Sequence, residues 1–175
     1  MKRNLHIGVA GAADCGPQEY ATAELVGAYI AQAGATLMCG GRLGVMEAAA
    51  KGAYLEKGTT IGILPGIERT DANDYIEHAI CTGMGQARNM IFVLSCDVLI
   101  AVGGEWGTLS EIAIALKHQI PVIAINSWES DALNRLNQDR LNYFNVNDSQ
   151  EAVKLAIQLA QDMQTQKRNI SESDN

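Results

Sequence analysis

Short apolar runs alternate along this chain with longer segments in which apolar residues recur at helical spacing. Runs without polar alternation predict strands buried on both faces of a sheet, and they lie at 5–10 (LHIGVA), 35–39 (ATLMC), 59–66 (TTIGILPG), 97–102 (DVLIAV) and 121–126 (PVIAIN). The helical spacing predicts helices at 17–33, 45–58, 86–96, 107–119 and 148–163. Residues 75–83 predict a further extended segment, whereas 127–147 give no clear pattern.

The alternation of strands and helices predicts an α/β fold. We expect a Rossmann-like, doubly wound parallel sheet with helices on both faces, because the apolar runs leave no face of the sheet for water. Residues 1–165 predict one ligand-binding domain, since no linker or repeat interrupts the alternation. The polar residues 166–175 predict a disordered tail.

The charge of the chain limits its expected partners. The formal net charge of the 175 residues is -7, and the 13 lysines and arginines are scattered along the sequence. Nucleic acids and anionic membranes require a basic face, so we expect neither as a partner. No apolar stretch approaches the roughly 18 residues of a membrane span, and the N-terminal residues lack a cleavage-site pattern, which together predict a cytoplasmic protein.

The cysteines predict packing residues and no metal site. They are irregularly spaced and form no Cys/His cluster, so we expect reduced thiols at Cys15, Cys39, Cys81 and Cys96.

Glycine-rich loops follow four of the predicted strands: GAADCG (11–16), CGGRLG (39–44), PGIER (65–69) and GGEWG (103–107). Ligands of open parallel sheets bind outside the carboxyl ends of the strands, so we expect the site among these loops. The chain contains neither a complete GxGxxG dinucleotide fingerprint nor a GxxxxGK[ST] P-loop. The glycines that would let backbone approach a ligand are Gly11, Gly40, Gly41, Gly44, Gly103, Gly104 and Gly107, although ordinary tight turns are the alternative interpretation.

The segment GGEWGT (103–108) favours a phosphate site because it opens a predicted helix. Its free amides, the helix dipole and the Thr108 hydroxyl would hold the negative charge. The side chain of Trp106 would pack against an aromatic ring system of the ligand. Glu111 lies three residues after Thr108 and therefore on nearly the same face of the helix.

An acidic chain must hold an anionic ligand with local cations, and two arginines lie beside glycines at the predicted site. Arg42 lies within the CGGRLG loop, and Arg88, with Asn89 beside it, opens a predicted helix. The alternative is that both arginines are solvated surface charges, and that Glu111 only complements the dipole of its helix.

Three motifs in order, GGRLGVMEAAAKGA, GQARNM and VGGEWGTLSEIA, closely resemble those of the molybdenum cofactor carrier proteins. These proteins are members of the wider SLOG superfamily, which includes the Lonely Guy phosphoribohydrolases and was formerly labelled as possible lysine decarboxylases. The resemblance covers roughly residues 5–165, and the order of the three motifs is more specific than any one of them.

In the Lonely Guy enzymes the last motif reads PGGxGTxxE, and its glutamate and an upstream arginine are catalytic. By this resemblance the two catalytic positions are Glu111 and Arg88. This chain departs from the enzymes' pattern in two motifs. The proline and second glycine of the last motif are replaced by Gly103 and Glu105, and in GGGxxGLMG two glycines are replaced by Cys39 and Glu47.

The resemblance therefore implies binding, protection and carriage of the molybdenum cofactor, a phosphorylated pterin, without turnover. The first alternative is a nucleoside 5'-monophosphate phosphoribohydrolase that releases free base, in which Glu111 stabilises the oxocarbenium-like centre or activates water, while Arg88 polarises the departing base or fixes the phosphate. The second is a nucleotide-sensing domain. The resemblance also implies a homodimer or homotetramer, and neither function requires a catalytic metal. Sequence leaves the natural ligand open, since glycine amides and arginines recognise phosphate alone.

Overall fold

The computed structural model describes residues 4–128 and 142–173, with side chains described up to residue 165. Seven strands form one sheet, and every neighbouring pair is parallel. The strands are β1 (His6–Gly11), β2 (Thr36–Cys39), β3 (Thr60–Leu64), β4 (His78–Cys81), β5 (Val98–Val102), β6 (Val122–Ile125) and β7 (Tyr143–Val146). The described helices are α1 (Pro17–Gln32), α2 (Val45–Leu55), α3 (Arg88–Leu94), α4 (Trp106–Lys117) and α6 (Ser149–Ser173), with short 3-10 turns at Arg69–Asp71 and Gly85–Ala87.

The strand order is β4-β3-β2-β1-β5-β6-β7, so the chain winds outward from β1 and then returns to build the other half from β5. All residues of β2, β5 and β6 are buried, as expected for strands without polar alternation. The structure confirms the predicted doubly wound parallel sheet.

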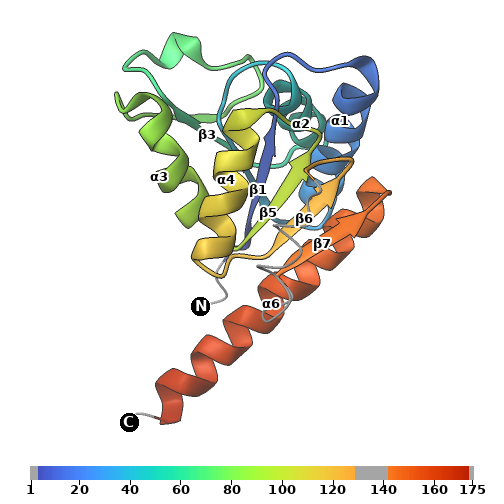
Figure 1. Cartoon of the computed structure of the whole chain (residues 1–175), viewed down its shortest axis with the longest axis vertical. Helices are drawn as coiled ribbons and strands as arrows, with labels where there is room; N and C mark the ends of the chain where they lie inside the picture. The colour runs from blue at the N-terminus through green and yellow to red at the C-terminus, as the bar shows by residue number, and fades with distance from the viewer. Residues whose placement is uncertain (1–3, 129–141, 174–175) are drawn as a thin grey trace.

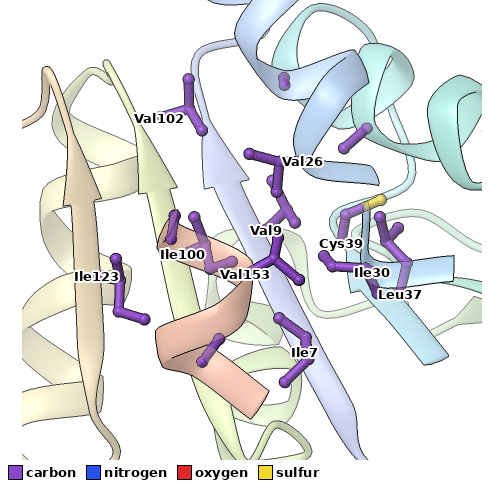
Figure 2. Close-up of a cluster of buried hydrophobic side chains, with 14 of the residues drawn as sticks. Ile7, Val9, Val26, Ile30, Leu37, Cys39, Ile100, Val102, Ile123 and Val153 are labelled. Carbon is purple, nitrogen blue, oxygen red and sulfur yellow. The ribbon is translucent and has the colours of Figure 1, made fainter. Parts of the chain in front are cut away.

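Two apolar clusters cover the two faces of the sheet. One joins side chains of the sheet to α1, α2 and α6, including Val26, Val45 and Val153. Figure 2 shows Val153 and Val26 over Ile7, Val9 and Ile100 of the central strands. The other cluster joins the opposite face to α3 and α4 through residues such as Phe92 and Ile112. Figure 1 shows these two helices side by side in front of the sheet.

The reversal of winding between β1 and β5 determines where a ligand can bind. These strands are paired in register from Ile7 opposite Val98 to Gly11 opposite Val102. The loops that follow them leave in different directions, because β1 leads to α1 on one face and β5 leads to α4 on the other. Such a switch point opens a crevice at the carboxyl edge of the sheet.

Three elements differ from the sequence prediction. Helix α3 is shorter than the predicted 86–96, because its first residues form a 3-10 turn. Strand β7 lies within 127–147, where no element was expected, and residues 129–141 of that segment lie outside the described residues. Helix α6 continues through Ser173, across most of the tail (166–175) for which disorder was expected, and its end extends beyond the sheet (Figure 1). The extension contains no Gly or Pro that would end the helix.

Helices α1 and α2 approach each other closely at two glycines. A Cβ atom at Gly27 would lie 1.9 Å from the carbonyl oxygen of Ala49, and one at Gly52 would lie 1.9 Å from that of Glu24. Lys51 and Glu24 add an ion pair of 2.9 Å between the same helices. This contact fixes the position of α2. It therefore also fixes the end of the CGGRLG loop, which directly precedes α2.

We expect Gly27→Ala to lower the free energy of unfolding by roughly 1–3 kcal/mol, because the added methyl group would force α1 away from α2. Gly107→Ala is the control, since a Cβ atom there meets nothing within 4 Å and alanine favours helix. Urea denaturation followed by circular dichroism measures both. A loss for Gly27→Ala no larger than that for Gly107→Ala would contradict the close approach.

Candidate functional site

A cavity of about 400 Å³ opens at the carboxyl edge of the sheet, where the loops after β1, β2, β3 and β5 converge with the start of α3. Its volume lies in the range of small-molecule sites. Nine of the residues expected from sequence line it: Gly11, Gly40, Arg42, Arg88, Asn89, Glu105, Gly107, Thr108 and Glu111.

The start of α3 and the second turn of α4 bring Arg88 and Glu111 together inside this cavity. Each helix packs its apolar face against the sheet through residues such as Phe92 and Ile112, which leaves these two polar side chains at the carboxyl edge. Arg88 Nη1 lies 3.5 Å from Glu111 Oε1, and both side chains are more than nine-tenths buried. Two charges that are distant in sequence therefore share one buried position.

This ion pair is incomplete. Arg88 Nε and Nη1 are buried and have no hydrogen-bond partner among the described residues, and the 3.5 Å contact is too long to supply a good one. Burial raises the pKa of Glu111 to about 7, although the positive charge of Arg88 opposes this shift. Buried polar groups are normally paired, so these groups indicate a site for a ligand.

The CGGRLG loop closes the side of the cavity next to Arg88. A Cβ atom at Gly40 would lie 2.5 Å from Arg88 Nη2, so only glycine leaves space for the guanidinium group. The N–H of Gly41 donates to Cys39 Sγ at 3.3 Å, and Asn73 Nδ2 donates to the carbonyl oxygen of Arg42 at 2.7 Å. These bonds hold the backbone while the Arg42 side chain lines the cavity.

The GGEWGT segment provides a helix start with free amides. Gly103 and Gly104 have φ values of +54° and +121°, which turn the chain sharply from β5 into α4. The helical hydrogen bonds include Leu109 N–H to Glu105 O, and Glu105 does not cap the helix with its side chain. Helix geometry therefore leaves the preceding N–H groups at Gly107 and Thr108, which line the cavity, for an external acceptor.

Five of the expected residues do not line this cavity: Gly41, Gly44, Gly103, Gly104 and Trp106. Trp106 is 78% exposed, and its ring lies 5.5 Å from that of Trp128 at the rim. Gly44 has a positive φ, and a Cβ there would collide with the carbonyl oxygen of Ala12. These residues shape the loops, and their backbone conformations explain the glycines.

The comparisons with known proteins agree with this architecture. The sequence model of the SLOG cluster4 family matches residues 4–153. The chain belongs to the SLOG cluster4 family.

Two solved structures resemble this member of the SLOG cluster4 family over nearly its whole length. The molybdenum cofactor binding protein of the phototrophic bacterium Rippkaea orientalis is 39% identical with a TM-score of 0.81, covering 89% of this chain and 96% of that protein. The molybdenum cofactor carrier protein of Chlamydomonas reinhardtii is 38% identical with a TM-score of 0.79, covering 90% and 98%. An uncharacterised protein of Archaeoglobus fulgidus is 50% identical over 113 residues, 65% of this chain and 74% of that protein. The family resemblance expected from the three motifs is confirmed.

Sequence reasoning missed two polar residues of this SLOG cluster4 site: Gln86, which lines the cavity, and Ser110, which bonds to Asn89. Ser110 Oγ accepts a hydrogen bond from Asn89 Nδ2 at 2.9 Å and donates one to the carbonyl oxygen of Gly107 at 2.7 Å. It therefore joins α3 to the start of α4. Its position three residues after Gly107 is a local signal, but only the packing of the two helices brings Asn89 to it.

Cys39 of this family member has a structural role. Cys39 is completely buried, its Sγ accepts from Gly41, and burial raises its pKa to about 12, so it stays a thiol. Within the described residues, no group of three or more His, Cys, Asp or Glu could hold a metal ion. In the same part of the chain, no helix is long and apolar enough to cross a membrane.

The raised pKa of Glu111 predicts a pH dependence of stability. Its pKa is higher in the folded protein, about 7, than the ordinary value of 4.5, so the folded state binds more protons between these values. The free energy of unfolding should therefore fall as pH rises from about 4.5 to about 7, by up to about 3 kcal/mol, and then level off.

Glu111→Gln should remove this contribution, because glutamine does not titrate. Denaturation of the wild type and the variant at pH 5, 6, 7 and 8 should show the variant gaining stability relative to the wild type up to about pH 7. A constant difference across this range would show that Glu111 titrates normally.

Proposed function

We propose that this protein binds, protects and carries the molybdenum cofactor, a phosphorylated pterin, in the cavity around Arg88 and Glu111. The observation that carries this proposal is the buried guanidinium group of Arg88, whose Nε and Nη1 lack hydrogen-bond partners in the described chain. The two similar solved structures are of a molybdenum cofactor binding protein and a molybdenum cofactor carrier protein. This chain is similar to both, and its site offers cations and free amides. Together these observations support the molybdenum cofactor as the cargo.

The groups that line the cavity fit an anionic cargo. Arg42 and Arg88 supply positive charge, and the N–H groups of Gly107 and Thr108 at the start of α4 are oriented for an acceptor such as a phosphate oxygen. Gly40 leaves the Arg88 guanidinium group open to the cavity, because a larger residue would occupy that space. Burial of the cargo against these loops would also limit its contact with water and oxidants.

Glu105 favours carriage over turnover. It lines the cavity at the position where the Lonely Guy motif has a glycine, and it brings a carboxylate beside the expected phosphate. A like charge there weakens the binding of any phosphate, and a larger cargo with donors of its own would offset this loss by bonding to the carboxylate. A carrier also requires affinity without the transition-state geometry of an enzyme.

Arg88→Gln should weaken binding of the molybdenum cofactor by about tenfold or more, because a charge-assisted hydrogen bond to the cargo is lost. Cofactor released anaerobically from a molybdoenzyme serves as the probe, and both its equilibrium binding and its rate of oxidative loss are measured. Arg69→Gln is the matched control, since Arg69 is exposed on a 3-10 turn and does not line the cavity. Failure of the wild type to bind, or equal binding by Arg88→Gln, would overturn the proposal.

A second candidate is a nucleoside 5'-monophosphate phosphoribohydrolase, and the contact between Arg88 and Glu111 is the observation that favours it. A carboxyl group whose pKa is about 7 can exchange a proton near neutral pH. In that reaction, water replaces the base at C1 of the ribose; Glu111 would stabilise the positive sugar centre or activate the water, and Arg88 would polarise the base or fix the phosphate.

Overnight incubation with adenosine 5'-monophosphate separates the two candidates. For a carrier we expect no release of adenine above the buffer blank, measured by chromatography. Release that is absent in Glu111→Gln and unchanged in Arg69→Gln would establish the hydrolase and displace pure carriage.

A further inference from the structure

A short hydrogen-bonded chain fixes the orientation of one amide in the cavity. Asn89 Nδ2 lies 2.9 Å from Ser110 Oγ, which lies 2.7 Å from the carbonyl oxygen of Gly107. A serine hydroxyl has one hydrogen, and the carbonyl oxygen can only accept it. Ser110 Oγ must therefore accept from Asn89, which requires the NH2 group of Asn89 to face Ser110.

The other end of the same amide is an acceptor without a partner. Asn89 Oδ1 is buried and has no hydrogen-bond partner among the residues that the structure describes, although Asn89 lines the cavity. Leaving such an acceptor unpaired is unfavourable. Because the amide cannot turn without breaking its bond to Ser110, the unpaired end of Asn89 is an oxygen and not a nitrogen.

A second acceptor lies in the same cavity. Glu111 follows Ser110 directly in α4, as Asn89 follows Arg88 in α3, and Asn89 and Glu111 both line the cavity. The carboxylate of Glu111 has several lone pairs, and the 3.5 Å contact with Arg88 leaves most of them for another donor. The two acceptors, Asn89 Oδ1 and the Glu111 carboxylate, would therefore suit a ligand that has more than one N–H group on one edge.

We propose that Asn89, positioned by Ser110, and Glu111 bind the donor edge of a 2-amino-4-oxo heterocycle, in which a ring N–H lies next to an exocyclic amino group. Pterins and guanine share this edge, and adenine lacks the adjacent ring N–H. The inference rests on the proposed function for the identity of the cargo. It adds which residues would bind the ring of that cargo. Arg42 and the amides at the start of α4 are left for the phosphate.

Three nucleotides that differ only in the base test the proposal by isothermal titration calorimetry. Guanosine 5'-monophosphate should bind about tenfold or more tightly than adenosine 5'-monophosphate, with inosine 5'-monophosphate, which lacks the amino group, between them. Equal affinity for the guanine and adenine nucleotides, or no measurable binding of either, would overturn the proposal.

Variants at Ser110 test its positioning role. Ser110 is exposed, and Ser110→Ala should lower the preference for guanine about tenfold by freeing the Asn89 amide, while the affinity for ribose 5-phosphate stays unchanged. Ser110→Thr should restore the preference, since it keeps the hydroxyl group, and Asn89→Asp should retain it, since it keeps the acceptor. Ser95→Ala is the matched control, because Ser95 Oγ also donates to a helical carbonyl oxygen, but to that of Ile91, which does not line the cavity. A preference that survives Ser110→Ala would overturn the role of Ser110.

Competition between the molybdenum cofactor and the guanine nucleotide decides which natural ligand supplies the donor edge. If the molybdenum cofactor displaces the guanine nucleotide at a lower concentration than the nucleotide itself requires, the cargo is the pterin. Guanine preference without cofactor binding would reject the proposed carriage while supporting the acceptor edge. Cofactor binding without any base preference would reject only the acceptor edge.

Discussion

The buried contact between Arg88 and Glu111 is the constraint on which the site depends. Removing two charges from water costs several kcal/mol each, and one contact of 3.5 Å does not offset that cost. The apolar core between the sheet and these helices must therefore hold α3 and α4 in place against it. The raised pKa of Glu111 is the measurable sign of this cost.

Small residues make this arrangement possible by letting backbone come close to charge and to other backbone. Gly40 leaves the space beside the Arg88 guanidinium group, and Gly27 lets α1 approach α2, which fixes the end of the CGGRLG loop. Cys39 occupies a glycine position of the Lonely Guy motif, and its buried thiol bonds to Gly41 of the loop and to Met46 at the start of α2. These bonds, and that from Asn73 to Arg42, connect the loop to the residues around it.

The fold could be predicted because uninterrupted apolar runs such as 97–102 have few alternatives to a parallel sheet covered on both faces. The edge at which the cavity opens follows from the same topology, and the family from the order of three motifs. Strand β7 was missed because YFNV carries a polar residue within a short edge strand. The pairing of Asn89 with Ser110 was beyond sequence because it depends on how α3 and α4 pack, and the contact between the rings of Trp106 and Trp128 likewise joins residues that only the fold brings together.

The two proposed functions would use this cavity in the same first step, because hydrolysis and carriage both begin by taking an anionic ligand out of water. Catalysis adds the demand that groups fit the transition state better than the ligand. Carriage adds the demand that every polar group of the cargo finds a partner, since an unpaired group weakens binding. Under the proposed carriage, the unpaired atoms of Arg88 and Asn89 and the carboxylate of Glu105 are the groups for which the cargo would supply partners.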